Sequence, residues 1–206
     1  MNNTVQDTDS ARLVLYAFVR SFFDSQPSKE KHEYWLMLLD ALGSGTGSRP
    51  LDEALLALKT ALSSSEVIDV QNEYYELFEN PFSPNRIQPF SSWYKDGKIM
   101  GPSLVKLRQL LYNLNLGKED SFRATEDHLV FLIDVMMHLI EESGRQDCEN
   151  TGVQASILRN HLLPVIRGME EKIGPLENFS VYKAAISVAS AFLGLEECLF
   201  PSSDST

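Results

Sequence analysis

Apolar residues recur along most of the chain at spacings of three and four, and no stretch shows the strict alternation of a half-buried strand. This pattern predicts an all-α fold of about eight helices. The expected helices cover residues 10–24, 28–42, a segment beginning at 51, and then 66–79, 103–115, 125–144, 151–173 and 178–198. The segment 129–140 contains only two polar residues, which predicts a helix at the centre of the fold.

Three features interrupt the helical pattern. Residues 43–50 (GSGTGSRP) predict a flexible break, and residues 80–92 hold three of the nine prolines. A helix cannot cross the second stretch, because each proline removes a backbone donor and clashes with the preceding turn. For the same reason Pro164 predicts a kink or split within the helix 151–173.

The domain organisation follows from these breaks. We expect one helical domain over residues 1–200, with two lobes, 1–116 and 125–200, hinged near 117–124 as an alternative arrangement. Residues 201–206 are expected to form a disordered tail.

Composition narrows the range of partners. The chain is 43% hydrophobic, enough for a sizeable core, and its 29 acidic and 18 basic residues give a formal net charge of −11. Nucleic-acid binding requires clustered basic side chains, so this balance argues against it and favours a cationic partner.

The N-terminal residues and the cysteines predict a cytoplasmic protein. Residues 1–10 lack the basic region of a secretory signal peptide, and the apolar run 13–23 is too short to span a bilayer. Two cysteines, Cys148 and Cys198, make no disulfide framework. We therefore expect a reducing compartment and no membrane insertion.

Aromatic residues concentrate around the proline-rich stretch. Seven of the 20 aromatic side chains lie within 21 residues, and prolines can hold such a loop open at low entropic cost. The rings therefore either line a groove or plug the core beneath a long loop. They are Tyr74, Tyr75, Phe78, Phe82, Phe90, Trp93 and Tyr94.

Catalytic and metal-binding patterns are weak. Asp127, Asp134, His138 and Glu141 share one helical stripe, which could hold a metal ion or could be the most solvated face of the helix. None of the four histidines lies in a recognised nucleophile or zinc motif, and the GSGTGS run lacks the lysine of a phosphate loop. We expect a non-enzyme without metal or other cofactor, with a metal-dependent hydrolase as a remote alternative.

Four short blocks, taken in order, resemble a known family. They are residues 74–81 (YYELFENP), 89–94 (PFSSWY) with Gly101 after them, 124–128 (ATEDH) and 161–164 (HLLP). The combination is similar to the motifs of the redox-enzyme maturation chaperones, the TorD/DmsD family. One departure is that Ala124 and Thr125 stand where that family has Glu-Pro, a motif to which a nucleotide role is sometimes attached.

The resemblance implies an all-α cytoplasmic chaperone for a molybdenum- or tungsten-containing oxidoreductase. Such a chaperone binds the twin-arginine signal peptide, the apo-form of the catalytic subunit, or both, assists cofactor insertion and delays export. The resemblance also allows a monomer or a homodimer, including a domain-swapped one. A helical adaptor for another amphipathic segment is the main alternative.

A twin-arginine leader has a basic pair followed by an apolar stretch, so an acidic protein with an aromatic groove complements both halves. We expect Asp127 to pair with an arginine, and His128 either to orient it or to bond a backbone group. The expected apolar contacts are Tyr74, Leu77, Phe78, Pro89, Phe90 and Tyr94.

Overall fold

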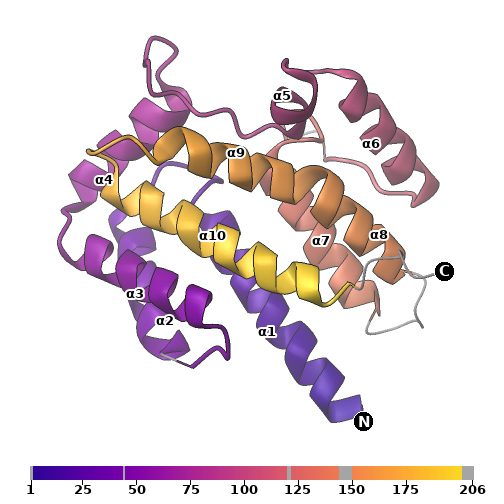
Figure 1. The fold of residues 1–206 in the computed structure, drawn as a ribbon, viewed down its shortest axis with the longest axis horizontal. Helices are drawn as coiled ribbons and strands as arrows, with labels where there is room; N and C mark the ends of the chain where they lie inside the picture. The colour runs from indigo at the N-terminus through magenta and orange to yellow at the C-terminus, as the bar shows by residue number, and fades with distance from the viewer. Residues whose placement is uncertain (1, 44, 120–121, 144–149, 201–206) are drawn as a thin grey trace. The chain divides into compact units, whose positions relative to one another are not determined.

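The computed structural model describes residues 2–43, 45–119, 122–143 and 150–200 (Figure 1). Over these residues the regular structure is helical apart from one isolated bridge, which confirms the all-α prediction. The helices are α1 (Asn2–Ser21), α2 (Lys29–Leu42), α3 (Arg49–Ser63), α4 (Val67–Tyr74), the π-helix η1 (Tyr75–Glu79), α5 (Ser91–Asp96), α6 (Pro102–Asn113), α7 (Leu129–Ser143), α8 (Asn150–Ile157), the π-helix η2 (Leu158–Leu162), α9 (Leu163–Ile173) and α10 (Ser180–Cys198).

The chain forms two compact units, each assembled from separate stretches of sequence. Unit 1 contains Met1–Arg20, Pro89–Val165 and Glu197–Thr206, and unit 2 contains Ser21–Gln88 and Ile166–Glu196. This division differs from the expected lobes 1–116 and 125–200, because residues on both sides of 117–124 belong to unit 1. A hinge at 117–124 stays a prediction.

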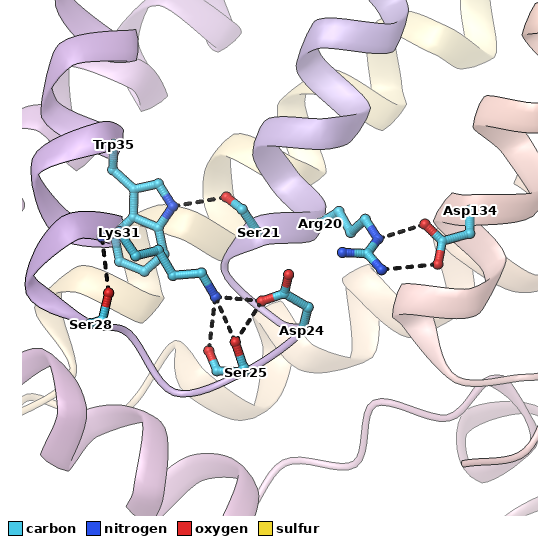
Figure 2. A network of polar contacts seen from close by, with 8 residues as sticks. All are labelled: Arg20, Ser21, Asp24, Ser25, Ser28, Lys31, Trp35 and Asp134. Atoms are coloured by element: carbon cyan, nitrogen blue, oxygen red, sulfur yellow. Dashed lines mark hydrogen bonds and ion pairs between the residues drawn. The ribbon is translucent and has the colours of Figure 1, made fainter. Parts of the chain in front are cut away.

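Unit 2 begins with a polar turn that joins α1 to α2 (Figure 2). Ser28 caps α2 by accepting a hydrogen bond from the Lys31 backbone N–H at 3.2 Å, as its position in the sequence predicts. The Lys31 ammonium bonds the Ser25 hydroxyl at 2.9 Å, and the buried Trp35 indole donates to Ser21 at 2.8 Å. Stacking of Trp35 on Phe22, with centroids 4.0 Å apart, then fixes α2 against the start of the unit.

Unit 1 is built around α7, in which nine of the 15 residues are buried. Its partly exposed Asp134 binds Arg20 through two bonds, 2.5 Å from Nε and 3.2 Å from Nη2 (Figure 2). This two-point contact attaches the end of α1 to α7 within unit 1.

Pro164 is accommodated by a π-helical turn. The segment α8–η2–α9 runs on through the proline, and η2 ends at Leu162, two residues before it, so the expected kink takes the form of a π-bulge. Pro164 has no N–H to donate to the carbonyl of Asn160, and the Lys95 ammonium donates to that carbonyl instead, at 2.7 Å.

Several predicted helix ends were wrong. Helix α1 begins at Asn2 rather than at a cap near residue 10, because nothing before that point breaks a helix. The short helix α5 was missed, since residues 91–96 follow a proline-rich loop. Thr125 does not start α7, which begins at Leu129.

The start of the last helix also differs from the prediction. Helix α10 begins at Ser180, and the side chain that bonds its first N–H groups is Glu73 of α4, not the expected Asn178. A cap supplied from a distant element cannot be read from local spacing.

Within the described residues, no helix combines the length and apolar character that crossing a bilayer requires. The predicted tail 201–206 and Cys148 lie outside the described residues.

Candidate functional site

The aromatic stretch of unit 2 forms a packed cluster. The ring of Phe78 lies 5.2 Å from that of Tyr74 and 5.5 Å from that of Tyr182, and it meets Phe23 edge-on at 5.9 Å. Tyr74 is 7% exposed, and burial raises its pKa to about 12. Phe78 is half-buried, so it is the member of the cluster with a face open to a ligand.

The proline-containing loop after η1 is fixed at its far end. The Ile87 backbone N–H donates to the Leu77 carbonyl at 2.8 Å, and both side chains are buried. At the near end, the Asn80 amide donates to Glu76 at 2.9 Å. These anchors leave Phe82, at the loop tip, 91% exposed.

An acidic hollow lies along the same helix in unit 2. It encloses about 540 Å³ between α4–η1 and the start of α10. Asp69, Glu73 and Glu76 reach it because spacings of four and three place them on one helix face. Its lining residues are Asp69, Asn72, Glu73, Glu76, Glu177, Asn178, Phe179 and Ser180.

The buried carboxylate of Glu73 caps the start of α10 at this hollow. It accepts hydrogen bonds from the backbone N–H groups of Tyr182 at 2.9 Å and Val181 at 3.3 Å. Burial nevertheless raises its pKa above the ordinary value. The carboxylates of Asp69, Glu76 and Glu177 are therefore the ones suited to meeting a cationic ligand.

In unit 1, Asp127 organises a buried network. Its Oδ2 accepts from the Ser92 hydroxyl at 2.5 Å and from the Ser92 backbone N–H at 3.0 Å, and its Oδ1 accepts from the Thr125 hydroxyl at 2.5 Å. Asp127 thus caps α5 from 35 residues away. Its side chain has no accessible surface, so it is not placed to pair with an arginine of a bound peptide.

Backbone bonds join the same two segments. Phe90 and His128 form an antiparallel bridge, flanked by Ser91 N–H to Asp127 carbonyl at 2.9 Å and Leu129 N–H to Pro89 carbonyl at 2.7 Å. The Phe90 and His128 rings meet edge-on at 5.1 Å. Both rings stay partly exposed, and together they make an apolar surface on unit 1.

The fourth sequence block joins this network through His161. Its Nδ1 shares a hydrogen bond of 2.9 Å with the Ser91 hydroxyl, and the ring is buried. Burial lowers the pKa of His161 to about 4, helped by the nearby Lys95, and burial likewise lowers the pKa of His128 to about 4. Both imidazoles are therefore neutral near pH 7.

Gly101, which follows the second block, is required by close packing. Its φ of −76° suits any residue, but an added Cβ would lie 2.5 Å from the Cβ of Asp96. Asp96 holds this position because its Oδ2 accepts from the backbone N–H and hydroxyl of Ser103, at 2.9 and 2.6 Å, at the start of α6. The three later blocks of the sequence therefore meet in one scaffold within unit 1.

The structure distributes the predicted contact residues over both units. Tyr74, Leu77 and Phe78 belong to unit 2, and Leu77 is completely buried there. The remaining five belong to unit 1, where four are partly exposed and one is buried. They are Pro89, Phe90, Tyr94 and His128, with Asp127 the buried one.

The alternative metal site gains no support. Asp127 is committed to Ser92 and Thr125, Asp134 pairs with Arg20, and His138 is exposed. Within the residues that the structure describes, no three metal-binding side chains gather in one place.

Sequence reasoning missed the acidic hollow and α5. Because a helix was expected there, the spacing of Asp69, Glu73 and Glu76 could have indicated that their carboxylates share one helix face. The contribution of Glu177 could not be predicted. Glu177 lies in the connection between α9 and α10, which meets α4 only in the folded chain.

The two histidines predict a pH dependence of stability. A folded-state pKa of about 4, against 6.5 when unfolded, means that the unfolded state binds more protons between these values. The free energy of unfolding should be level above about pH 7.5 and fall by roughly 2–3 kcal/mol in total by about pH 5.5.

Urea denaturation followed by circular dichroism at several pH values measures this effect, with His161→Asn as the comparison. In this variant the free energy of unfolding should fall by only about half as much, since asparagine does not titrate but can still bond Ser91. If the free energies of unfolding of the two proteins changed equally with pH, the assignment of half of the effect to His161 would be wrong.

Comparisons with known proteins agree with this architecture. Residues 46–169 match the model of the family described as nitrate reductase delta subunit. The chain is 29% identical over 112 residues to the chaperone protein TorD of Vibrio cholerae serotype O1 strain O395, and 30% identical to that of strain N16961. These matches cover 51% of this chain, and the chain spans about half the length of these relatives (50%).

A solved structure shows the same fold. It is described as a candidate redox enzyme maturation protein from Archaeoglobus fulgidus, and it matches with a TM-score of 0.54 at 18% identity. The match covers 90% of this chain and 93% of the other. Because the family model spans more than half of the chain, the protein belongs to the nitrate reductase delta subunit (TorD-type) family, which confirms the resemblance that its motifs indicate.

Proposed function

We propose that this protein is a cytoplasmic maturation chaperone for a molybdenum- or tungsten-containing oxidoreductase. It binds the twin-arginine signal peptide of that enzyme, its apo-form, or both, and so delays export until the cofactor is in place. The observation that carries the proposal is the family match over residues 46–169, supported by relatives named as TorD chaperones. The family assignment also agrees with a protein that is not an enzyme.

The leader is proposed to bind along α4–η1 in unit 2. Asp69, Glu76 and Glu177 there offer negative charge to a basic pair, while Phe78 and Phe82 offer apolar surface to the stretch that follows. Arginine suits such a site, since its planar guanidinium can bond two carboxylate oxygens at once.

The remaining expected contacts take revised roles in this proposal. Tyr74 and Leu77 support Phe78 from within the unit, and Asp127 positions α5 instead of contacting the peptide. Pro89, Phe90, Tyr94 and His128 form a second apolar contact region on unit 1.

Charge-neutralising substitutions test the proposed location. The double variant Asp69→Asn/Glu177→Gln should weaken binding of a twin-arginine leader peptide about tenfold, because two attractive charges are removed at the site. Calorimetric titration near physiological salt measures the dissociation constant.

The matched control is Asp40→Asn/Glu53→Gln, which removes the same charge from a second hollow of unit 2, on α2–α3. This variant should bind within about twofold of the wild type. If both double variants weaken binding equally, only the net charge matters and the assignment to α4–η1 is wrong.

A further inference from the structure

A group of exposed apolar residues on unit 1 has no part in the proposed leader contacts. It is formed by α5, the loop 97–101 and α6, and we name it the α5–α6 surface (Figure 1). Val105 and Tyr112, seven residues apart, lie on one face of α6, and Trp93 on α5 is 43% exposed. Its exposed apolar residues are Trp93, Ile99, Met100, Val105 and Tyr112.

Two hydrogen bonds fix the conformation of the loop within this surface. The Gly97 backbone N–H donates to the Trp93 carbonyl at 3.0 Å, and the Met100 N–H donates to the Ser92 hydroxyl at 3.1 Å. The same hydroxyl donates to Asp127, so the buried network of unit 1 determines the shape of the loop.

Met100 combines a strained backbone with an exposed side chain. Its φ is +61°, a left-handed conformation that favours glycine, yet its side chain is 68% exposed. Glycine would relax the backbone at this position. Such strain is characteristic of residues that act at binding sites.

The charge of this surface is opposite to that of the rest of the chain. Residues 91–113 contain four basic residues and one acidic residue, a net +3, against −14 for the remainder of the chain. One of these positive charges, that of Arg108, is paired with Glu126 from outside the segment. Three exposed lysines lie on these segments: Lys95 on α5, Lys98 in the loop, and Lys106 on α6 next in sequence to Val105. Lys95 is bonded to a carbonyl, so Lys98 and Lys106 supply the charge.

We propose that the α5–α6 surface docks an acidic amphipathic segment of a partner polypeptide. Apolar side chains of the segment cover Met100, Val105 and Trp93, and its carboxylates meet Lys98 and Lys106. That the partner is the folded body of the client enzyme rests on the proposed function, whereas the chemistry of the segment rests on this surface alone.

Tryptophan fluorescence tests the proposal, because the two tryptophans differ in exposure. Trp35 is fully buried and Trp93 is exposed, so quenching by iodide reports on Trp93, as a Trp93→Phe variant would verify. The probe is a helical peptide of about 18 residues with leucine on one face and glutamate on the other. It should shield Trp93 from iodide, and a lysine-for-glutamate version should do so at least about tenfold more weakly.

Two variants separate recognition from folding. Met100→Gly should bind the glutamate peptide about tenfold more weakly and yet resist urea at least as well as the wild type. Lys98→Glu/Lys106→Glu should also lose binding, whereas the control Lys172→Glu in unit 2 should not. Both surface variants should still bind a twin-arginine peptide. Failure of the wild-type protein to bind that peptide would count against the proposed function and not against this surface. Loss of leader binding in the surface variants alone would assign the surface to the leader and overturn this inference.

Three further results would overturn the inference. Equal shielding by the two peptides would remove its charge specificity. Shielding by phosphatidylglycerol vesicles but not by the glutamate peptide would assign the surface to a membrane. Shielding that rises with protein concentration in the absence of peptide would assign it to a second copy of the chain.

Discussion

Replacing Asp127 with alanine is expected to lower the free energy of unfolding by about 3–5 kcal/mol. The substitution leaves the Ser92 N–H, the Ser92 hydroxyl and the Thr125 hydroxyl buried without their acceptor, and it removes the cap of α5. Urea denaturation at pH 7, followed by circular dichroism, measures the change.

The neighbouring Glu126 provides the matched control. Its partly buried carboxylate binds the exposed Arg108 at 2.7 Å and accepts from no buried donor of the Asp127 network, so Glu126→Ala should cost about 1 kcal/mol. Asp127→Asn should remain clearly destabilised, because its NH₂ group would face hydroxyl and N–H donors. An Asp127→Ala variant as stable as Glu126→Ala would show that the network does not hold unit 1 together.

Gly101→Ala is expected to destabilise the protein by about 3 kcal/mol. The new methyl group cannot be placed unless Asp96 moves, because the ideal Cβ position lies 2.6 Å from the Asp96 Cγ. Moving Asp96 breaks its two bonds to Ser103 and exposes the start of α6. The midpoint of urea denaturation and the helical signal report the loss.

Gly117→Ala is the control for this prediction. It lies in the same unit with no atom within 4 Å of an added Cβ, and should change stability by less than about 0.5 kcal/mol. Equal stability of the two alanine variants would mean that Asp96 can move aside at little cost. Glycine would then not be required at position 101.

Much of the fold could be predicted from the sequence because helical periodicity is a local signal. The long apolar α7 and the cap at Ser28 are examples in which one segment contains all the information. Helix α5 was missed, because its six residues carry no periodic pattern and its cap comes from Asp127, 35 residues away. The π-turn before Pro164 was expected only as a kink, since spacing does not reveal how a helix passes a proline.

The candidate site could be predicted only in part, for a related reason. The motif blocks include residues that form the buried network of unit 1, yet the sequence suggested that Asp127 was available to an arginine of a ligand. Its neighbours in the fold, Ser92 and Thr125, take up its oxygens. Exposure is decided by tertiary packing, so the carboxylates available to a ligand, such as Glu177, became visible only in the structure.

Calorimetric titration of a leader peptide is the most direct test of the central claim. A peptide with two adjacent arginines followed by an apolar stretch should bind with a dissociation constant near the micromolar range, and more weakly as salt increases. A peptide identical except for two lysines should bind about tenfold more weakly, because lysine cannot make the two-point contact with a carboxylate. Equal affinities for the two peptides, or no heat of binding at about 100 μM peptide, would contradict the account.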